Sequence, residues 1–233
     1  MVCETTEVLA GLPDDDAWLT PSERTRLDAM QHPHRRAQFR AGHGLARQLL
    51  ARAEGARDWR AWSLSCSAHG APLSQRDGQP VTRQVSIAHS GPWLACATAP
   101  HPLGVDIESG PRPRELLELA RSLYPPHFVA ELEACDEQER RSRFYRRWTL
   151  DEAHAKMSGR GLLRSQLRTR AWETTGPLEA SALSWDLEIG WLALSVPPST
   201  PSPARLLEES PPVLKLPAAS RPGTVHCWRM IAA

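Results

Sequence analysis

The chain has 233 residues with 28 basic and 27 acidic side chains, and its formal charge of +1 argues against a nucleic-acid-binding or membrane-surface protein. It has no run of 18 apolar residues and no basic stretch followed by an apolar run near its start, so neither a transmembrane helix nor a signal peptide is expected. Its five cysteines form no CxxC pair, which favours reduced thiols in a cytoplasmic protein over a disulfide framework or a zinc site.

The first sixty residues carry helix signals. A capping sequence over 20–23, with a threonine cap, a proline in the first turn and a glutamate three residues after the cap, predicts a short helix. The apolar spacing over 32–52 predicts a second helix. Alternating side chains over 59–65 then predict a strand.

The next stretch has the clearest strand signals. Residues 85–88, 93–98 and 103–108 predict three strands, separated by Gly- and Pro-containing breaks. Because the connections are short, we expect a meander of antiparallel neighbours.

Helical signals dominate 114–157, with an interruption at 124–126 and a glycine stop after 158. Residues 185–188 and 191–196 predict a hairpin. From 197 to 222 the chain is rich in Pro, Ser and Ala, which is typical of an extended or poorly ordered tail. The order of helices and strands predicts an α+β fold.

Two carboxylates share one face of the strand predicted over 103–108. Because side chains alternate along a strand, its apolar residues point to the core while Asp106 and Glu108 point together to the other side. Mg²⁺ commonly takes carboxylates together with substrate phosphates. An ordinary strand with a solvated acidic face gives the same pattern, so both interpretations stay open.

The helix predicted to end near 157 carries a second polar group. Trp148, Glu152 and Lys156 follow at i, i+4 and i+8 and therefore share one helix face. Glu152 could be a third carboxylate for a metal, with a cation one turn further on. The alternative is a common Glu–Lys pair on a surface helix.

A histidine stands at the end of the strand predicted over 85–88. His89 precedes a Gly-containing turn, where its ring and nearby backbone N–H groups could bind a phosphate. A histidine at a strand end is otherwise unremarkable.

Three segments in this order and spacing carry a family resemblance: SIAHSG over 86–91, GVDIE over 104–108 and WTLDEAHAK over 148–156. Together they resemble the 4′-phosphopantetheinyl transferase superfamily, and most of all its Sfp type, whose single chain carries two similar halves. The resemblance covers roughly residues 18–196.

The resemblance implies an α+β fold of two similar sub-structures, each a small antiparallel sheet packed with helices. We expect an N-terminal half over 1–103, a C-terminal half over 104–196 with the metal site at the junction, and a Pro-rich C-terminal tail over 197–233. By the same analogy we expect a monomer.

The resemblance also implies roles for single residues. Asp106, Glu108 and Glu152 would hold Mg²⁺ against the pyrophosphate of coenzyme A. Lys156 would lie beside the phosphate under attack, and His89 would contact a coenzyme A phosphate. The serine of an apo acyl or peptidyl carrier protein would attack, 3′,5′-ADP would leave, and either Glu152 or a water molecule on the metal would take the serine proton.

Basic residues near the start add a further expectation. Arg36, Arg40 and Arg47 could form a patch for the 3′-phosphate, as N-terminal basic residues do in the family. The competing interpretation is a solvated helix face.

The match has departures. Asp151 and Ala71 stand where the family usually has lysine, and Asp151 is either a fourth acid near the site or a surface residue. These changes favour an alternative function, a non-catalytic protein of the same fold that binds coenzyme A or a carrier protein. A different Mg²⁺-dependent phosphotransferase lacks support, because the chain has neither a GxxxxGK[ST] nor a GxGxxG loop.

Overall fold

A computed structural model of the chain describes residues 1–68, 70–110, 115–200, 202–203 and 224–232. The helices are α1 (Thr5–Ala10), α2 (Pro21–Asp28), α3 (Pro33–Ala53), α4 (Leu116–Leu123), α5 (Pro126–Ala134), α6 (Glu137–Ser158) and α7 (Arg164–Thr169). The strands are β1 (Val2–Glu4), β2 (Trp62–Cys66), β3 (Pro72–Arg76), β4 (Gln79–Pro80), β5 (Gln84–Ser90), β6 (Trp93–Ala99), β7 (Gly104–Ser109), β8 (Arg170–Thr174), β9 (Ala182–Leu187), β10 (Gly190–Ser195) and β11 (Val225–Ala232).

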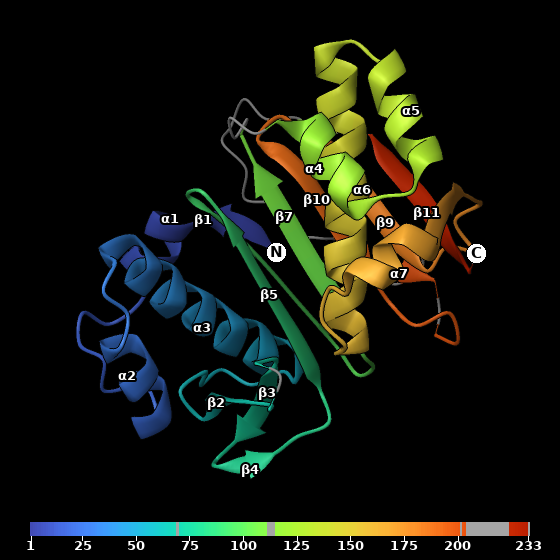
Figure 1. The fold of residues 1–233 in the computed structure, drawn as a ribbon. Coiled ribbons are helices and arrows are strands. Elements are labelled where there is room, and N and C mark those ends of the chain that lie inside the picture. Colours follow the sequence, from blue (N-terminus) through green and yellow to red (C-terminus); the bar gives the residue numbers. More distant parts are fainter. Residues whose placement is uncertain (69, 111–114, 201, 204–223, 233) are drawn as a thin grey trace.

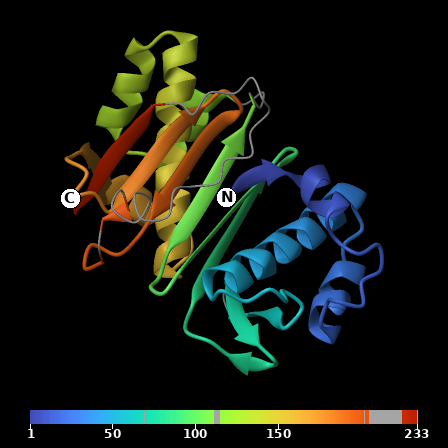
Figure 2. The ribbon, with the colours of Figure 1, turned by 180° about the vertical axis from the view of Figure 1, so that it is seen from behind.

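The elements form two groups that meet along β5 and β7 (Figure 1). In the first group α3 packs against a three-stranded sheet in the order β1-β6-β5, and a second small sheet has the order β2-β3-β4. In the second group α6 packs on a five-stranded sheet in the order β7-β10-β9-β11-β8. Figure 2 shows these five strands from the side opposite α6. The predicted α+β fold, with small antiparallel sheets packed with helices, is confirmed.

Local sequence signals explain where the helices begin and end. The capping box predicted at 20–23 is formed at the start of α2, and the second predicted helix is α3. The break at 124–126 separates α4 from α5, although residue 114 lies outside the described residues. Asp136 caps α6 by accepting a hydrogen bond from the backbone N–H of Glu139, and Gly159 ends it with φ 66°.

The predicted meander is only partly right. β5 and β6 are antiparallel neighbours, but β7 pairs with β10 and not with β6. β7 contacts β5 through side chains instead, because the hydroxyls of Ser86 and Ser90 each accept a 3.0 Å hydrogen bond from the backbone N–H groups of Val105 and Ser109. The apolar face of β7 is buried in a cluster that contains residues of β9 and β10 as well as of β1, β5 and β6, so this strand lies where the two groups meet.

The predicted hairpin is confirmed as the antiparallel pair of β9 and β10. The tail prediction is wrong for residues 225–232, because they form β11, which lies between β9 and β8. The Pro-rich composition that suggested a tail stops before this apolar segment, and residues 204–223 lie outside the described residues. The division of the chain into two domains at residues 103 and 104 stays a prediction.

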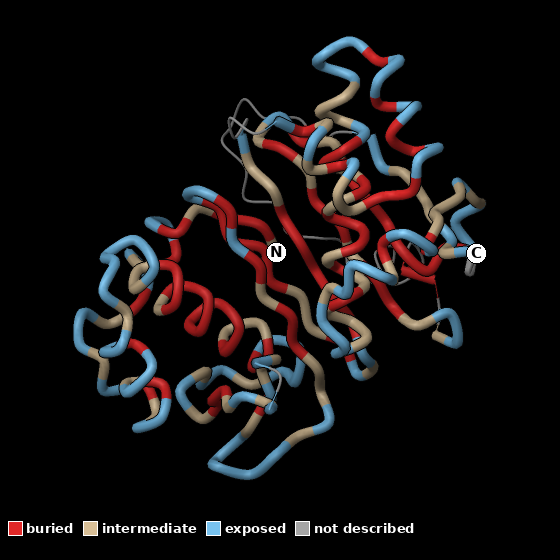
Figure 3. The backbone as a smooth tube through the Cα atoms, in the orientation of Figure 1, coloured by how far each residue is buried: buried red, intermediate tan, exposed pale blue. Residues whose placement is uncertain are grey.

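The backbone of α6 lies directly on the first residue of β7. A Cβ atom on Gly104 would lie 1.9 Å from the carbonyl oxygen of Ala153 and 2.6 Å from the backbone nitrogen of Met157. Only glycine fits there, so the first residue of the GVDIE segment permits this close approach. Figure 3 shows that much of β7 and of the neighbouring α6 is buried. No helix within the described residues is long and apolar enough to cross a bilayer.

Candidate functional site

Asp106 of β7 is joined to α6 by an ion pair. The ammonium of Lys156 lies 2.7 Å from Asp106 Oδ1 and also donates to the carbonyl of Val105 at 3.1 Å. Asp106 is only 7% exposed, and burial raises its carboxyl pKa to about 6 despite the opposing charge of Lys156. Its second oxygen, Oδ2, is buried and has no hydrogen-bond partner in the described part of the chain.

Glu108 is held from two sides. The hydroxyl of Ser90, at the end of β5, donates to Glu108 Oε2 at 3.0 Å, and the indole N–H of Trp148 on α6 donates to Oε1 at 3.2 Å. The Trp148 ring is parallel to that of Phe144 one turn earlier, with the centroids 6.4 Å apart. The sequence analysis did not identify Ser90 as a site residue. The feature that could have indicated it is its position directly after His89, at the end of a strand.

Glu152 lies on the helix face that the spacing predicts, together with Trp148 and Lys156. Burial raises the pKa of the half-buried Glu152, the charge of Lys156 opposes this shift, and the charge of Glu108 adds to it. The charges of Glu152 and Glu108 likewise raise the pKa of Asp106. The structure therefore brings the three acids and Lys156 into one electrostatic group.

His89 lies at the edge of this group. Its ring nitrogen Nε2 is 3.3 Å from the guanidinium of Arg35, at the start of α3. Although His89 is exposed, desolvation by neighbouring atoms lowers the pKa of its ring, and the charges of Arg35 and Lys156 lower it further. A neutral imidazole can accept the hydrogen bond from Arg35.

The donor set fits a hard divalent cation in its chemistry. Carboxylate oxygens are the ligands that Mg²⁺ prefers, and the buried, unpartnered Oδ2 of Asp106 is an oxygen that a cation would satisfy. As placed, however, no three His, Cys, Asp or Glu side chains among the described residues are gathered closely enough to hold a metal ion. The ammonium of Lys156 neutralises Asp106 instead.

Two arginines that the sequence suggested for phosphate binding have other partners. Arg36 pairs with Asp28 at 3.6 Å, and Arg40 pairs with Asp16 at 2.7 Å. Both line a cavity of about 370 Å³ between the start of α3 and the segment that follows α1. The arginine that contacts the histidine of the candidate site is their neighbour Arg35.

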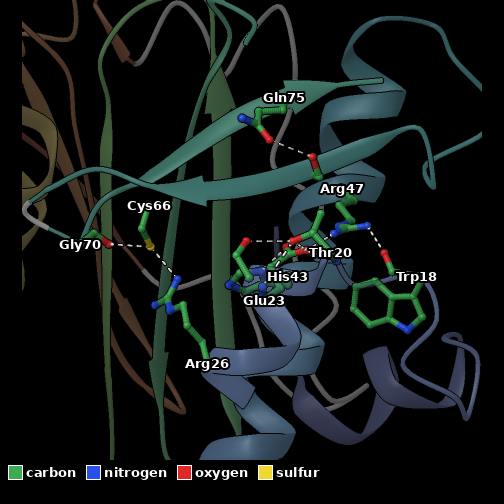
Figure 4. A network of polar contacts seen from close by, with 11 residues as sticks. Trp18, Thr20, Glu23, Arg26, His43, Arg47, Cys66, Gly70 and Gln75 are labelled. Atoms are coloured by element: carbon green, nitrogen blue, oxygen red, sulfur yellow. Dashed lines mark hydrogen bonds and ion pairs between the residues drawn. The ribbon is translucent and has the colours of Figure 1, made fainter. Parts of the chain in front are cut away.

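The prediction that Arg47 belongs to a phosphate patch is wrong. Figure 4 shows Arg47 reaching from α3 toward Trp18 and Glu23. Arg47 is only 1% exposed and forms an ion pair with Glu23, which also binds His43 Nδ1 at 2.7 Å. Although burial alone would raise it, the pKa of Glu23 is lowered by the hydrogen bond to His43 and the charge of Arg47. This group joins α2 to α3.

Asp151 is neither a fourth acid open to the site nor a surface residue, as the sequence suggested. It is fully buried, and its carboxylate accepts hydrogen bonds from Arg147 at 2.7 Å, Arg170 at 3.2 Å and Trp172 Nε1 at 3.0 Å. Each helical residue is rotated by about 100° from the next, so Asp151 faces β8 while Glu152 faces β7. The acid at this position thus connects α6 to the far edge of the sheet.

We expect Asp151→Asn to lower the free energy of unfolding by about 3–5 kcal/mol, because two guanidinium groups would lose their buried counter-charge. The measurement is urea denaturation at pH 7. The control is Glu137→Gln, whose 73% exposed side chain pairs with Arg141 on the same helix; its effect should stay below about 0.5 kcal/mol. Equal effects of the two substitutions would contradict the buried role of Asp151.

Comparison with known proteins agrees with this geometry. Residues 102–182 match the family model of the 4′-phosphopantetheinyl transferase superfamily. The chain is 36% identical over 77 residues to 4′-phosphopantetheinyl transferase Sfp of Bacillus subtilis, an alignment that covers 33% of this chain and 34% of the relative.

Two cyanobacterial relatives align over longer stretches. The chain is 25% identical over 178 residues to 4′-phosphopantetheinyl transferase HetI of Nostoc, covering 76% of this chain and 75% of the relative. It is 29% identical over 171 residues to a putative 4′-phosphopantetheinyl transferase of Synechocystis, covering 69% and 64%. The chain spans only about a third of the length of the two Bacillus subtilis relatives that it matches. The resemblance to Sfp-type 4′-phosphopantetheinyl transferases is confirmed, and the match to the superfamily model lies in residues 102–182.

Proposed function

We propose that this protein transfers the 4′-phosphopantetheine group of coenzyme A to a serine of an apo acyl or peptidyl carrier protein and releases 3′,5′-ADP. The observation that carries the proposal is the 2.7 Å contact of Lys156 with Asp106, inside the segment that matches the superfamily. It places an ammonium beside a group of three acids. The relatives named as 4′-phosphopantetheinyl transferases support the same activity.

In this proposal Lys156 stabilises the charge that grows on the phosphate under attack. Its side chain is 31% exposed, so a phosphate can approach the ammonium from solvent while the aliphatic part stays packed. A fixed cation at this place stabilises the transition state where negative charge develops. His89 and Arg35 supply further donors for a phosphate of coenzyme A.

Glu152 is the carboxylate that we propose as the acceptor of the serine proton. It is half-buried on the same helix face as Lys156, and burial raises its pKa. A carboxylate with a raised pKa is a stronger base than an exposed one at neutral pH. The serine hydroxyl needs such a base, because it is a weak nucleophile on its own.

Asp106, Glu108 and Glu152 are the residues that would hold Mg²⁺ in this proposal, and binding would have to draw their carboxylates closer together than they lie in this structure. When bound, the cation would neutralise the pyrophosphate of coenzyme A and orient it. The buried, unpartnered Oδ2 of Asp106 supports this assignment. Ser90 and Trp148 would keep the carboxylate of Glu108 in a fixed orientation toward it.

A non-catalytic binding protein of the same fold is the second candidate. The replacement of the family's usual lysines by Asp151 and Ala71 favoured a binding protein. Asp151, however, belongs to a buried ion-pair group on the other side of α6. The residue type at position 151 therefore says little about the candidate site.

We propose further that the enzyme is a cytoplasmic monomer of two domains, divided at residues 103 and 104.

The transferase is tested by mixing the protein with an apo carrier protein, coenzyme A and Mg²⁺ and weighing the carrier by mass spectrometry. We expect the carrier to gain one phosphopantetheine, and EDTA or Asp106→Asn to abolish the gain. Lys156→Met should slow transfer by at least about 100-fold, because it removes the cation at the developing charge. The control is Asp28→Asn, an exposed acid of α2, which should react like the natural protein. An unchanged mass across several carriers would favour the binding protein.

A second prediction separates Arg35 from Arg36. Since Arg35 contacts His89 and Arg36 is paired with Asp28, we expect Arg35→Gln to raise the KM for coenzyme A by about tenfold through loss of a charge-assisted hydrogen bond. Arg36→Gln should leave the KM unchanged. A larger effect from Arg36→Gln would place the phosphate in the 370 Å³ cavity at the start of α3.

A further inference from the structure

A second cavity, of about 420 Å³, lies on the flank of α6 that faces away from β7. Its lining comes from the end of α6 with the turn that follows, from α7 and the start of β8, and from β11. In Figure 1, α7 and β11 lie to the right of α6. His154 is two residues beyond Glu152 and so is rotated by about 200° around the helix. The cavity is therefore separate from the candidate site.

Two side chains of this cavity, His154 and Arg160, form no hydrogen bond or ion pair within the described residues. The His154 ring makes an edge contact with Trp172, and its pKa is lowered to about 4 by desolvation and by the charges of Arg170 and Arg160, so the ring is neutral. Arg170, which also lines the cavity, is by contrast bound to Asp151 and to Gln166. A guanidinium and an imidazole are thus available to a ligand.

The other lining residues define the charge and the polarity of the cavity. No Asp or Glu is among the lining residues, so nothing there offsets the positive charge of Arg160. The hydroxyls of Ser158 and Thr169 add polar atoms that can contact oxygen atoms of a ligand. Met230 and Ile231 of β11 add apolar atoms to the lining. A lining that combines an arginine and hydroxyl groups with apolar side chains suits a ligand with an anionic part and an apolar part.

We propose that this cavity binds a small organic anion, with a phosphate or carboxylate at Arg160 and His154 and an apolar body against Met230. The volume is at the lower end of the range for small-molecule sites, which favours a compact ligand. Because the site contacts α6 on one side and β11 on the other, a bound anion would link the helix of the candidate site to the C-terminal strand. The proposal does not depend on the transferase activity.

The test uses the methionine methyl groups of the full chain as reporters. The protein has only four methionines, and Met230 lines the cavity whereas the partly buried Met30 packs against the core of the first group. Phenyl phosphate is titrated into protein labelled with ¹³C at the methionine methyl groups. We expect the Met230 signal to shift with saturation and the Met30 signal to stay. Benzyl alcohol, which has the same ring without the charge, should leave both signals in place.

Variants decide where the anion binds. Arg160→Gln should weaken the binding by about tenfold through loss of one charge-assisted hydrogen bond, and His154→Asn should weaken it as well. Arg164→Gln is the control, because Arg164 is exposed on α7 and does not line the cavity; it should leave the binding unchanged. Lys156→Met, in the candidate site, should also leave the binding unchanged. The proposal is overturned if the Met230 signal does not move, if benzyl alcohol shifts it equally, or if Lys156→Met and not Arg160→Gln abolishes binding. A short acidic peptide that binds more tightly than phenyl phosphate would also overturn it, since the cavity would then recognise a protein carboxylate.

Discussion

The close packing of α6 on β7 is the constraint on which the rest of the candidate site depends. Because Gly104 has no Cβ atom, the backbone of α6 can approach β7 more closely than any other residue at this position would allow. From this contact the helix face carries Lys156 to Asp106 and the indole of Trp148 to Glu108. The residues of the candidate site are therefore aligned by a glycine that has no functional group of its own.

The two acids of β7 are each bound by side chains from distant parts of the chain. Asp106 is buried and would be costly to ionise alone, yet the ammonium of Lys156 lies beside it. On the opposite side of α6, Asp151 accepts hydrogen bonds from two buried arginines. One helix therefore presents Glu152 and Lys156 to β7 and a closed ion-pair group to β8. The face toward β7 carries the candidate site, while the buried ion pairs of the other face join the helix to β8.

The sequence predicted the elements and acids that follow simple periodicity. Alternation placed Asp106 and Glu108 together, and the i+4 spacing placed Trp148, Glu152 and Lys156 on one face. Features that depend on tertiary packing were beyond its reach. The pairing of β7 with β10, the insertion of β11 between β9 and β8, and the burial of Arg47 all depend on which distant surfaces meet. A charged residue on a helix has no local sign that it will be buried, which is why Arg47 and Asp151 were misplaced.

The most direct test of this account is to add one methyl group where α6 meets β7. Gly104→Ala should lower the free energy of unfolding by about 1–3 kcal/mol and, in protein still folded at the assay temperature, slow phosphopantetheine transfer at least tenfold. Gly176→Ala is the matched substitution, because a Cβ atom there would meet no neighbour within 4 Å and the backbone φ is not positive. If Gly104→Ala behaves like Gly176→Ala in both stability and transfer, the contact does not align the site and the account is contradicted.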